Sequence, residues 1–203
     1  VAPDHPSDDP VLRELVHSFL VWEASLSKAA IAMKKLDQTF VDCNELRVSL
    51  REEIIGVIGA RYPMARERSA RLRAVLNDLY EQKHETTLTF LTSMPKREAR
   101  NFLASLDGMP PFVASRVALV ALGIHAVPVD ERVRKALLCE GALNDDLDVS
   151  GASGWLERQI RAEEAPVCWA SIEHWCETAP ATKPRSRHDE SSSPHLAPLI
   201  YGK

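Results

Sequence analysis

Apolar residues recur at every third or fourth position along most of this chain, which is the spacing of one face of an α-helix. The clearest case is residues 11–20, where six apolar side chains follow this interval after Asp9 and Pro10, two residues suited to a helix N-terminus. No segment alternates apolar and polar residues between hairpin turns, so no strand is predicted. The pattern predicts an all-α protein, with helices near residues 11–20, 25–36, 44–58, 64–82, 87–91, 95–106, 111–122, 129–140, 153–161 and 165–177.

Both ends of the chain depart from this pattern. Residues 1–10 hold three Pro and three Asp with almost nothing apolar, and residues 178–203 are rich in Pro and Ser. Such segments bury too little apolar surface to offset the entropy of ordering them. We therefore expect a disordered lead-in and a loosely ordered tail.

Length and composition exclude several classes of protein. A chain of 203 residues, 45% of them hydrophobic, can bury a core in one large domain or two small ones. Its longest apolar run, residues 117–124, is far shorter than the ~20 residues of a membrane span, and no signal peptide is visible. Four cysteines without tight pairing suit a reducing compartment, so we expect a cytoplasmic protein, nucleoid-associated if bacterial, with no membrane partner.

The net charge of −4 argues at first against a nucleic-acid partner. The charge is unevenly distributed, however: residues 59–137 carry 13 basic and 8 acidic groups, between two acidic ends. The composition therefore permits DNA binding by one basic face.

One segment combines a helix, a tight Gly/Pro turn, an apolar helix, a short loop, an acid and another helix. Gly108 permits a dihedral or a close approach that a Cβ would block, and the N-terminus of the next helix can bind an anion such as phosphate. Asp130 follows 22 residues later at the start of a helix. Its carboxylate can cap that helix through the amides of residues 131–133, or face a cleft as a catalytic group.

The segment contains the runs Leu106-Asp-Gly-Met-Pro-Pro-Phe-Val-Ala114 and Val127-Pro-Val-Asp130-Glu-Arg-Val133. Together they resemble the helix-hairpin-helix and Gly/Pro-Asp motif of the HhH-GPD (endonuclease III-like) superfamily of DNA base-excision glycosylases. The resemblance implies two helical lobes that flank a DNA cleft. We place one at residues 11–122, with the helix-hairpin-helix at about 95–122, and the other at 123–177, completed by N-terminal residues.

The resemblance also implies the activity and the partner. The hairpin would bind backbone phosphates of double-stranded DNA carrying a lesion or mismatch, and Asp130 would lie in the pocket of a flipped nucleotide. A fixed carboxylate there stabilises the positive charge that develops on the sugar and can orient or deprotonate a water. The protein is expected to act as a monomer. The hairpin residues implied are Leu106, Gly108, Met109, Phe112, Val113 and Ala114.

Three departures from the superfamily pattern refine this hypothesis. The lysine that forms a Schiff base in bifunctional members is matched by Phe112, and Arg116 cannot replace it, so a monofunctional enzyme without lyase activity is expected. Pro110 and Pro111 lack the N–H groups that a Gly-x-Gly hairpin offers to phosphate. The four-cysteine spacing of an iron–sulfur cluster is missing, and the seven histidines show no zinc-like spacing, so neither cluster nor metal is expected.

Further candidates have two interpretations each. Trp22 and Glu23 occupy the stretch that in the superfamily often carries Leu-Ser-x-Gln, so they are candidates for a base pocket; alternatively Trp22 is core and Glu23 a solvated helix residue. Arg68 and Arg71 of the arginine-rich helix, with Arg116, are candidate phosphate contacts or simply a charged helix face. The alternative function is a DNA-binding or lesion-sensing module that has lost catalysis, and a third is a helical interaction protein that does not touch DNA.

Overall fold

The structure is a computed structural model, and it describes residues 9–178. These residues form ten α-helices and one short 3-10 helix, with no strand among them, which confirms the all-α prediction. The expectations for residues 1–8 and 179–203 lie outside the described part of the chain. The helices are α1 (Pro10–Val21), α2 (Leu26–Thr39), α3 (Cys43–Val48), α4 (Arg51–Ile58), α5 (Ala65–Lys83), η1 (Thr89–Ser93), α6 (Lys96–Ser105), α7 (Pro111–Val120), α8 (Glu131–Cys139), α9 (Val149–Gln159) and α10 (Ala165–Thr178).

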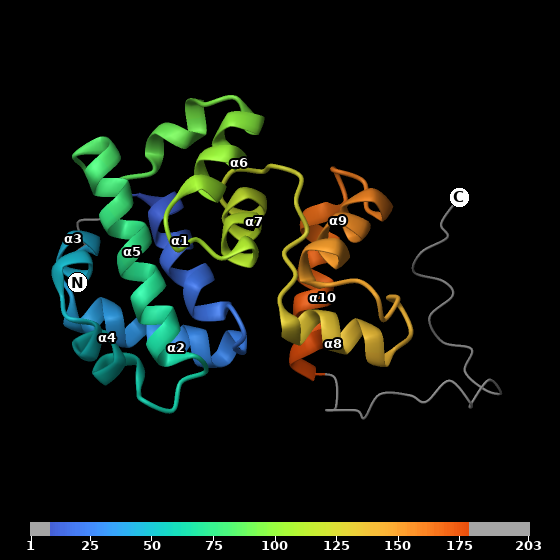
Figure 1. Ribbon diagram of the computed structural model, residues 1–203, viewed down its shortest axis with the longest axis horizontal. Coiled ribbons are helices and arrows are strands. Elements are labelled where there is room, and N and C mark those ends of the chain that lie inside the picture. Colours follow the sequence, from blue (N-terminus) through green and yellow to red (C-terminus); the bar gives the residue numbers. More distant parts are fainter. Residues whose placement is uncertain (1–8, 179–203) are drawn as a thin grey trace, which may run out of the picture.

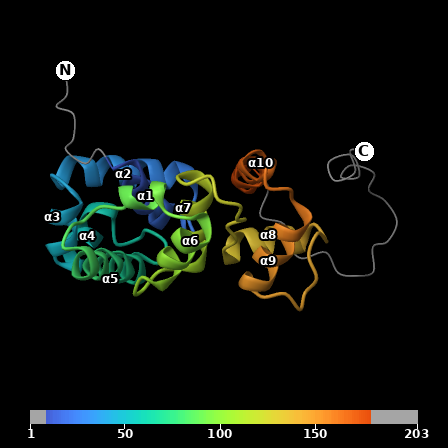
Figure 2. The ribbon, with the colours of Figure 1, turned by 90° about the horizontal axis from the view of Figure 1, so that it is seen from above.

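The helices gather into two lobes of unequal size (Figure 1). Helices α1–α7 form the larger lobe, and α8–α10 form the smaller one, joined to it by the extended segment 122–130. A second view shows the same two groups side by side (Figure 2). Helix α1 packs against α2, α5 and α7, so the described N-terminal residues belong to the larger lobe. The expectation that N-terminal residues complete the smaller lobe stays a prediction for residues 1–8, which lie outside the described part of the chain.

The first helix begins at a buried acid. The Asp9 Oδ1 atom accepts hydrogen bonds from the N–H groups of Val11 at 3.0 Å and Leu12 at 2.9 Å. Its Oδ2 atom accepts from the Thr87 hydroxyl at 2.7 Å and the Leu88 N–H at 2.5 Å. Asp9 therefore both caps α1 and holds the loop before η1. The expected lead-in was too long by these two residues, because Asp9 and Pro10 are part of the fold.

Two predicted helices differ from those observed. The single helix expected over residues 44–58 is wrong, because the chain breaks into α3 and α4 at Ser49 and Leu50. The Ser49 hydroxyl donates to the Leu46 carbonyl at 2.8 Å, and the Glu53 carboxylate accepts the Leu50 N–H at 2.7 Å. These side chains satisfy backbone groups that a continuous helix would have paired. The helix expected at 87–91 is the 3-10 turn η1.

The predicted hairpin forms between α6 and α7 and lies against α5. Gly108 has a φ of +78°, and a Cβ there would stand 3.1 Å from the Ala74 Cβ and 3.4 Å from the Arg71 carbonyl oxygen. The turn therefore needs glycine both for its dihedral and for its close approach to α5. The Asp107 N–H donates to the Asp78 carboxylate at 2.8 Å, a second tie to α5.

Candidate active site

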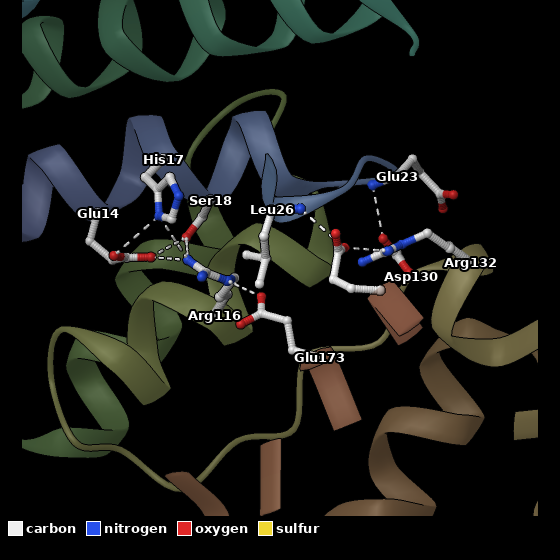
Figure 3. Close-up of polar contacts among 10 residues, drawn as sticks. Glu14, His17, Ser18, Glu23, Leu26, Arg116, Asp130, Arg132 and Glu173 are labelled. Carbon is white, nitrogen blue, oxygen red and sulfur yellow. Dashed lines mark hydrogen bonds and ion pairs between the residues drawn. The ribbon is translucent and has the colours of Figure 1, made fainter. Parts of the chain in front are cut away.

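Asp130 is the N-cap of α8, at the junction of the two lobes. Its Oδ1 atom accepts the Val133 N–H at 2.8 Å, which is the capping bond anticipated for this residue. Its Oδ2 atom accepts the N–H of Glu23, also at 2.8 Å, from the loop between α1 and α2 (Figure 3). The side chain is only 1% exposed. One carboxylate thus starts a helix of the smaller lobe and holds a loop of the larger one.

Glu23 also contacts α8 through its own carboxylate. It follows Trp22, the residue that ends α1, and has a φ of +54°, a left-handed conformation that is costly for a residue with a side chain. Its Oε1 atom accepts the Glu131 N–H, the first of α8, at 2.7 Å. Two carboxylates therefore meet the positive end of the α8 dipole, and the polar contacts run in both directions between the lobes. We call Glu23, Asp130 and the first turn of α8 the acid corner.

The electrostatics of the acid corner distinguish Glu23. Burial raises its pKa, and the negative charge of Asp130 raises the pKa further, while the Glu131 N–H opposes these effects. Glu23 is half-buried, in contrast to the sealed Asp130. The acid corner thus holds one enclosed carboxylate and one accessible carboxylate with a raised pKa.

Arg68 is a cation whose charge Glu23 and Asp130 favour, and it is buried. Its guanidinium donates to the Pro63 carbonyl, with Nη2 at 3.0 Å and Nε at 3.3 Å, and Nη2 also donates to the Trp22 carbonyl. Burial lowers the pKa of Arg68 to about 10, although both carboxylates favour its charge. A residue 1% exposed and engaged with carbonyls does not meet a phosphate, which corrects the role expected for Arg68. Its Nη1 atom has no hydrogen-bond partner within residues 9–178.

Trp22 and Arg71 connect the acid corner to the hairpin. Trp22 is half-buried, and its ring centroid lies 5.9 Å from the guanidinium carbon of Arg68 and 5.6 Å from that of Arg71. Arg71 is more exposed and pairs with Glu67 at 2.9 Å, while its Nη1 atom lies 3.4 Å from the Gly108 carbonyl oxygen. The structure therefore brings both base-pocket candidates and one phosphate candidate to the same place; their roles stay predictions.

The hairpin presents backbone rather than side chains. Four of the hairpin residues have buried side chains, Leu106, Phe112, Val113 and Ala114, and the expected binding of phosphate by the hairpin stays a prediction. Only Met109 is half-buried. Helix α7 makes its first internal bond from the Ala114 N–H to the Pro110 carbonyl at 3.0 Å, so the amides before it lie at an uncapped N-terminus.

Arg116 also lies at the lobe junction, in a buried cluster that sequence reasoning missed. It is 5% exposed, its Nη1 atom pairs with Glu14 of α1, and its Nε atom pairs with Glu173 of α10 at 3.2 Å (Figure 3). Nη1 also contacts Ser18 at 3.2 Å and His17 at 3.4 Å. The phosphate role expected for Arg116 is corrected, because the guanidinium is enclosed between two glutamates. We call this group the Arg116 cluster.

Phe112 in α7 and the positions of the cysteines bear on two kinds of chemistry, Schiff-base formation and iron–sulfur binding. Phe112, at the position matched to the Schiff-base lysine, packs edge-on against Trp169 of α10 with ring centroids 6.1 Å apart. The chain has four cysteines, and one of them, Cys43, starts α3 in the larger lobe while the other three lie in α8 and α10. This donor set does not fit a four-cysteine cluster. Within the described residues, no group of three or more His, Cys, Asp or Glu could hold a metal ion.

The arrangement of two helical lobes, the hairpin α6–α7 and an acid at the start of the following helix is similar to the fold of solved endonuclease III and 8-oxoguanine glycosylase/lyase structures. Endonuclease III trapped as a covalent intermediate with DNA aligns over 85% of this chain and 76% of its own, with 19% identity and a TM-score of 0.66. A non-covalent endonuclease III–DNA complex gives the same coverage and TM-score at 18% identity. The Clostridium acetobutylicum 8-oxoguanine glycosylase/lyase, solved with double-stranded DNA containing cytosine opposite 8-oxoG, aligns over 82% of this chain and 59% of its own, with 13% identity and a TM-score of 0.65.

These similarities confirm the fold that the motif predicted. No family model and no curated protein matches the chain by sequence. None of the described helices has the length and apolarity needed to cross a membrane.

Proposed function

We propose that this protein is a monofunctional DNA N-glycosylase that hydrolyses the bond between a flipped damaged or mismatched base and its deoxyribose. The observation that carries the proposal is the acid corner. Two carboxylates, Glu23 and Asp130, meet at one helix N-terminus between the lobes, beside Trp22 and the hairpin. Paired carboxylates in different environments are the arrangement that glycosidic bond cleavage uses.

Asp130 has the properties of an electrostatic stabiliser. Breaking the N-glycosidic bond builds positive charge on the sugar, and a fixed anion in a poorly solvated site lowers the energy of that state. Two N–H donors at 2.8 Å hold the Asp130 carboxylate before substrate arrives.

The chain's own residues favour hydrolysis over lyase chemistry. A Schiff base needs an amine, and the matched position holds Phe112, sealed by Trp169. Water is then the nucleophile, and the product is an intact strand with an abasic site. We propose that the protein works without an iron–sulfur cluster, since its cysteines are divided between the lobes. The partner is double-stranded DNA, bound as a monomer by the basic central part of the chain.

Base release from defined duplexes tests this function. Purified wild-type protein and Asp130→Asn are incubated with a panel of duplexes, each holding one damaged or mismatched base, and free base is measured by mass spectrometry. Asparagine keeps an oxygen to accept the Val133 N–H and cap α8, but its amide nitrogen cannot accept the Glu23 N–H, so circular dichroism is used to check that the variant is folded. We expect release from at least one duplex by wild type alone, and no borohydride-trapped cross-link. Equal release by both proteins, or none by either, would contradict the proposal.

A lesion-binding protein without catalysis is the second candidate, and two observations favour it. Both Asp130 oxygens are engaged and the side chain is sealed. At the hairpin, the Asp78 carboxylate accepts the Asp107 N–H, and Pro110 and Pro111 offer none. A lesion-dependent gel shift that weakens with salt, in the absence of base release, would identify this candidate. Binding that is absent or insensitive to salt would instead indicate an interaction protein that does not use DNA.

A further inference from the structure

We propose that Glu23 is a second catalytic residue, which donates a proton to the departing base, and that the substrates are consequently bases that are neutral when bound. The inference rests on the proposed function. It starts from a difference within the acid corner: Asp130 is sealed by two N–H donors, whereas Glu23 is half-exposed and accepts the Glu131 N–H through Oε1.

The position of Glu23 is held from both sides. Its backbone N–H is bound to Asp130 in the smaller lobe, and its carboxylate is bound to the first N–H of α8. The left-handed backbone at Glu23, with φ at +54°, persists because these contacts hold it. Backbone strain of this kind is typical of functional sites, where it fixes the direction of a side chain. Here it places the Glu23 carboxylate next to Asp130, the group that stabilises the sugar.

The charged groups that face Glu23 favour its protonated form. From α8, Asp130 and Glu131 are negative, and Arg132 is positive but pairs with Glu177 at 2.9 Å. From α5, Arg68 is positive, but its guanidinium is bound to the carbonyls of Pro63 and Trp22. Burial and the Asp130 charge raise the pKa of Glu23 above that of a free glutamate. A larger fraction of Glu23 is therefore protonated near neutral pH, which is the state that a general acid needs.

The reaction can be written with both residues. The Glu23 carboxyl proton passes to a ring nitrogen or carbonyl oxygen of the base, and the glycosidic C–N bond breaks with its electron pair going to the base. The base leaves neutral, and the cationic sugar is stabilised by Asp130. Water then adds to the anomeric carbon and gives its proton to the Glu23 carboxylate. Glu23 ends protonated, as it began, so no other reactant is needed.

This step separates two classes of substrate. A neutral base is a poor leaving group until it is protonated, so its release depends on an acid. A base alkylated on a ring nitrogen, such as 7-methylguanine, already carries a positive charge and leaves without protonation. The presence of a proton donor therefore indicates neutral substrates, such as deaminated, oxidised or mismatched bases.

The test compares Glu23→Gln with wild type on two matched duplexes under single-turnover conditions. One duplex contains the neutral base released fastest in the panel, and the other contains 7-methylguanine. Glutamine keeps an oxygen to accept the Glu131 N–H but cannot act as the acid. We expect a loss of about 10²–10⁴-fold on the neutral base and less than about 3-fold on 7-methylguanine. The wild-type rate on the neutral base should fall as the pH rises through the Glu23 pKa, and this fall should vanish in the variant.

Glu53→Gln is the matched control, because Glu53 also accepts a backbone N–H at a helix start but lies in α4. It should leave both rates unchanged. An equal loss on both duplexes, or no loss on the neutral base, would overturn the role of Glu23 while leaving the glycosylase proposal in place. Release of cationic bases alone by wild type would overturn it as well. Release of neither class by wild type would contradict the proposed function and this inference together.

Discussion

Two of the charged groups at the junction of the lobes bury carboxylates in opposite ways: one pairs them with a cation and the other does not. In the Arg116 cluster, one guanidinium lies between Glu14 and Glu173, with His17 alongside. Burial by itself raises the pKa of Glu14, but the His17 hydrogen bond and the Arg116 charge outweigh it, and the pKa is lowered overall. Each buried charge has an opposite partner, as a structural ion cluster requires.

In the acid corner, two carboxylates are brought together, while Arg68 is bound to carbonyls and Arg132 is paired with Glu177 instead. The pKa of Glu23 is accordingly raised rather than lowered. The difference shows that charge is neutralised elsewhere at the lobe junction, in the Arg116 cluster and in the Arg100–Glu157 pair, whereas neither Glu23 nor Asp130 forms an ion pair within residues 9–178. An unneutralised acid pair is unfavourable for folding, and such arrangements concentrate at functional sites.

The largest stability effect should come from the Arg116 cluster. Arg116→Met leaves Glu14 and Glu173 buried without a cation, and we expect the free energy of unfolding to fall by about 3–5 kcal/mol. Urea unfolding followed by circular dichroism measures it. Arg13→Met is the control, because Arg13 pairs with Asp37 at the surface and should contribute less than about 1 kcal/mol. Similar losses for both variants would remove the distinction between a buried cluster and a surface pair.

The Arg116 cluster should also make the protein sensitive to acid. The folded pKa of Glu14 is lowered, so its stabilising contribution is present above its unfolded pKa and is lost as the pH falls through the folded pKa. Wild type should lose more stability than Glu14→Gln between pH 6 and pH 3. Thermal unfolding across this range measures the difference. Parallel pH profiles for the two proteins would show that Glu14 titrates as it does in the unfolded chain.

A smaller effect of opposite sign is expected in the acid corner. The folded pKa of Glu23 is raised, so its contribution to stability is complete below the unfolded pKa and declines as the pH rises through the folded pKa. Glu23→Gln should therefore stabilise the protein at pH 7–8, by roughly 0.5 kcal/mol because the group is half-exposed. The gain should disappear near pH 4. A destabilised variant at pH 8 would mean that the charge of Glu23 supports the fold, as the charges of the Arg116 cluster do.

Local sequence signals were sufficient for most of the helices and for the position of Asp130. The 3.6-residue pattern and the Asp9-Pro10 start identified α1, and the hairpin-to-acid spacing identified the N-terminus of α8. The break between α3 and α4 was missed because Ser49 and Glu53 satisfy backbone groups through side chains, which periodicity does not record.

The arginines show the limit of this kind of inference. Arg68 and Arg116 were assigned to an exposed face, yet both are buried, since their partners come from distant segments: Trp22 is 46 residues from Arg68, and Glu14 is 102 residues from Arg116. A charged residue on an amphipathic helix has the same local pattern whether it faces water or another helix. Only the packing of the helices distinguishes a solvent-facing arginine from a buried one: α5 against the end of α1 for Arg68, and α7 against α1 and α10 for Arg116.

The central claim, that the acid corner is the reaction site, is tested most directly by the single-turnover rate of base release at saturating protein. Wild type is compared with Asp130→Asn and with Asp148→Asn, whose aspartate caps α9 by accepting the Gly151 N–H and so controls for the same chemical change at another helix start. We expect Asp130→Asn to lower the rate by about 10²–10⁴-fold and Asp148→Asn to leave it within a factor of about two. Equal rates for all three folded proteins would contradict the account.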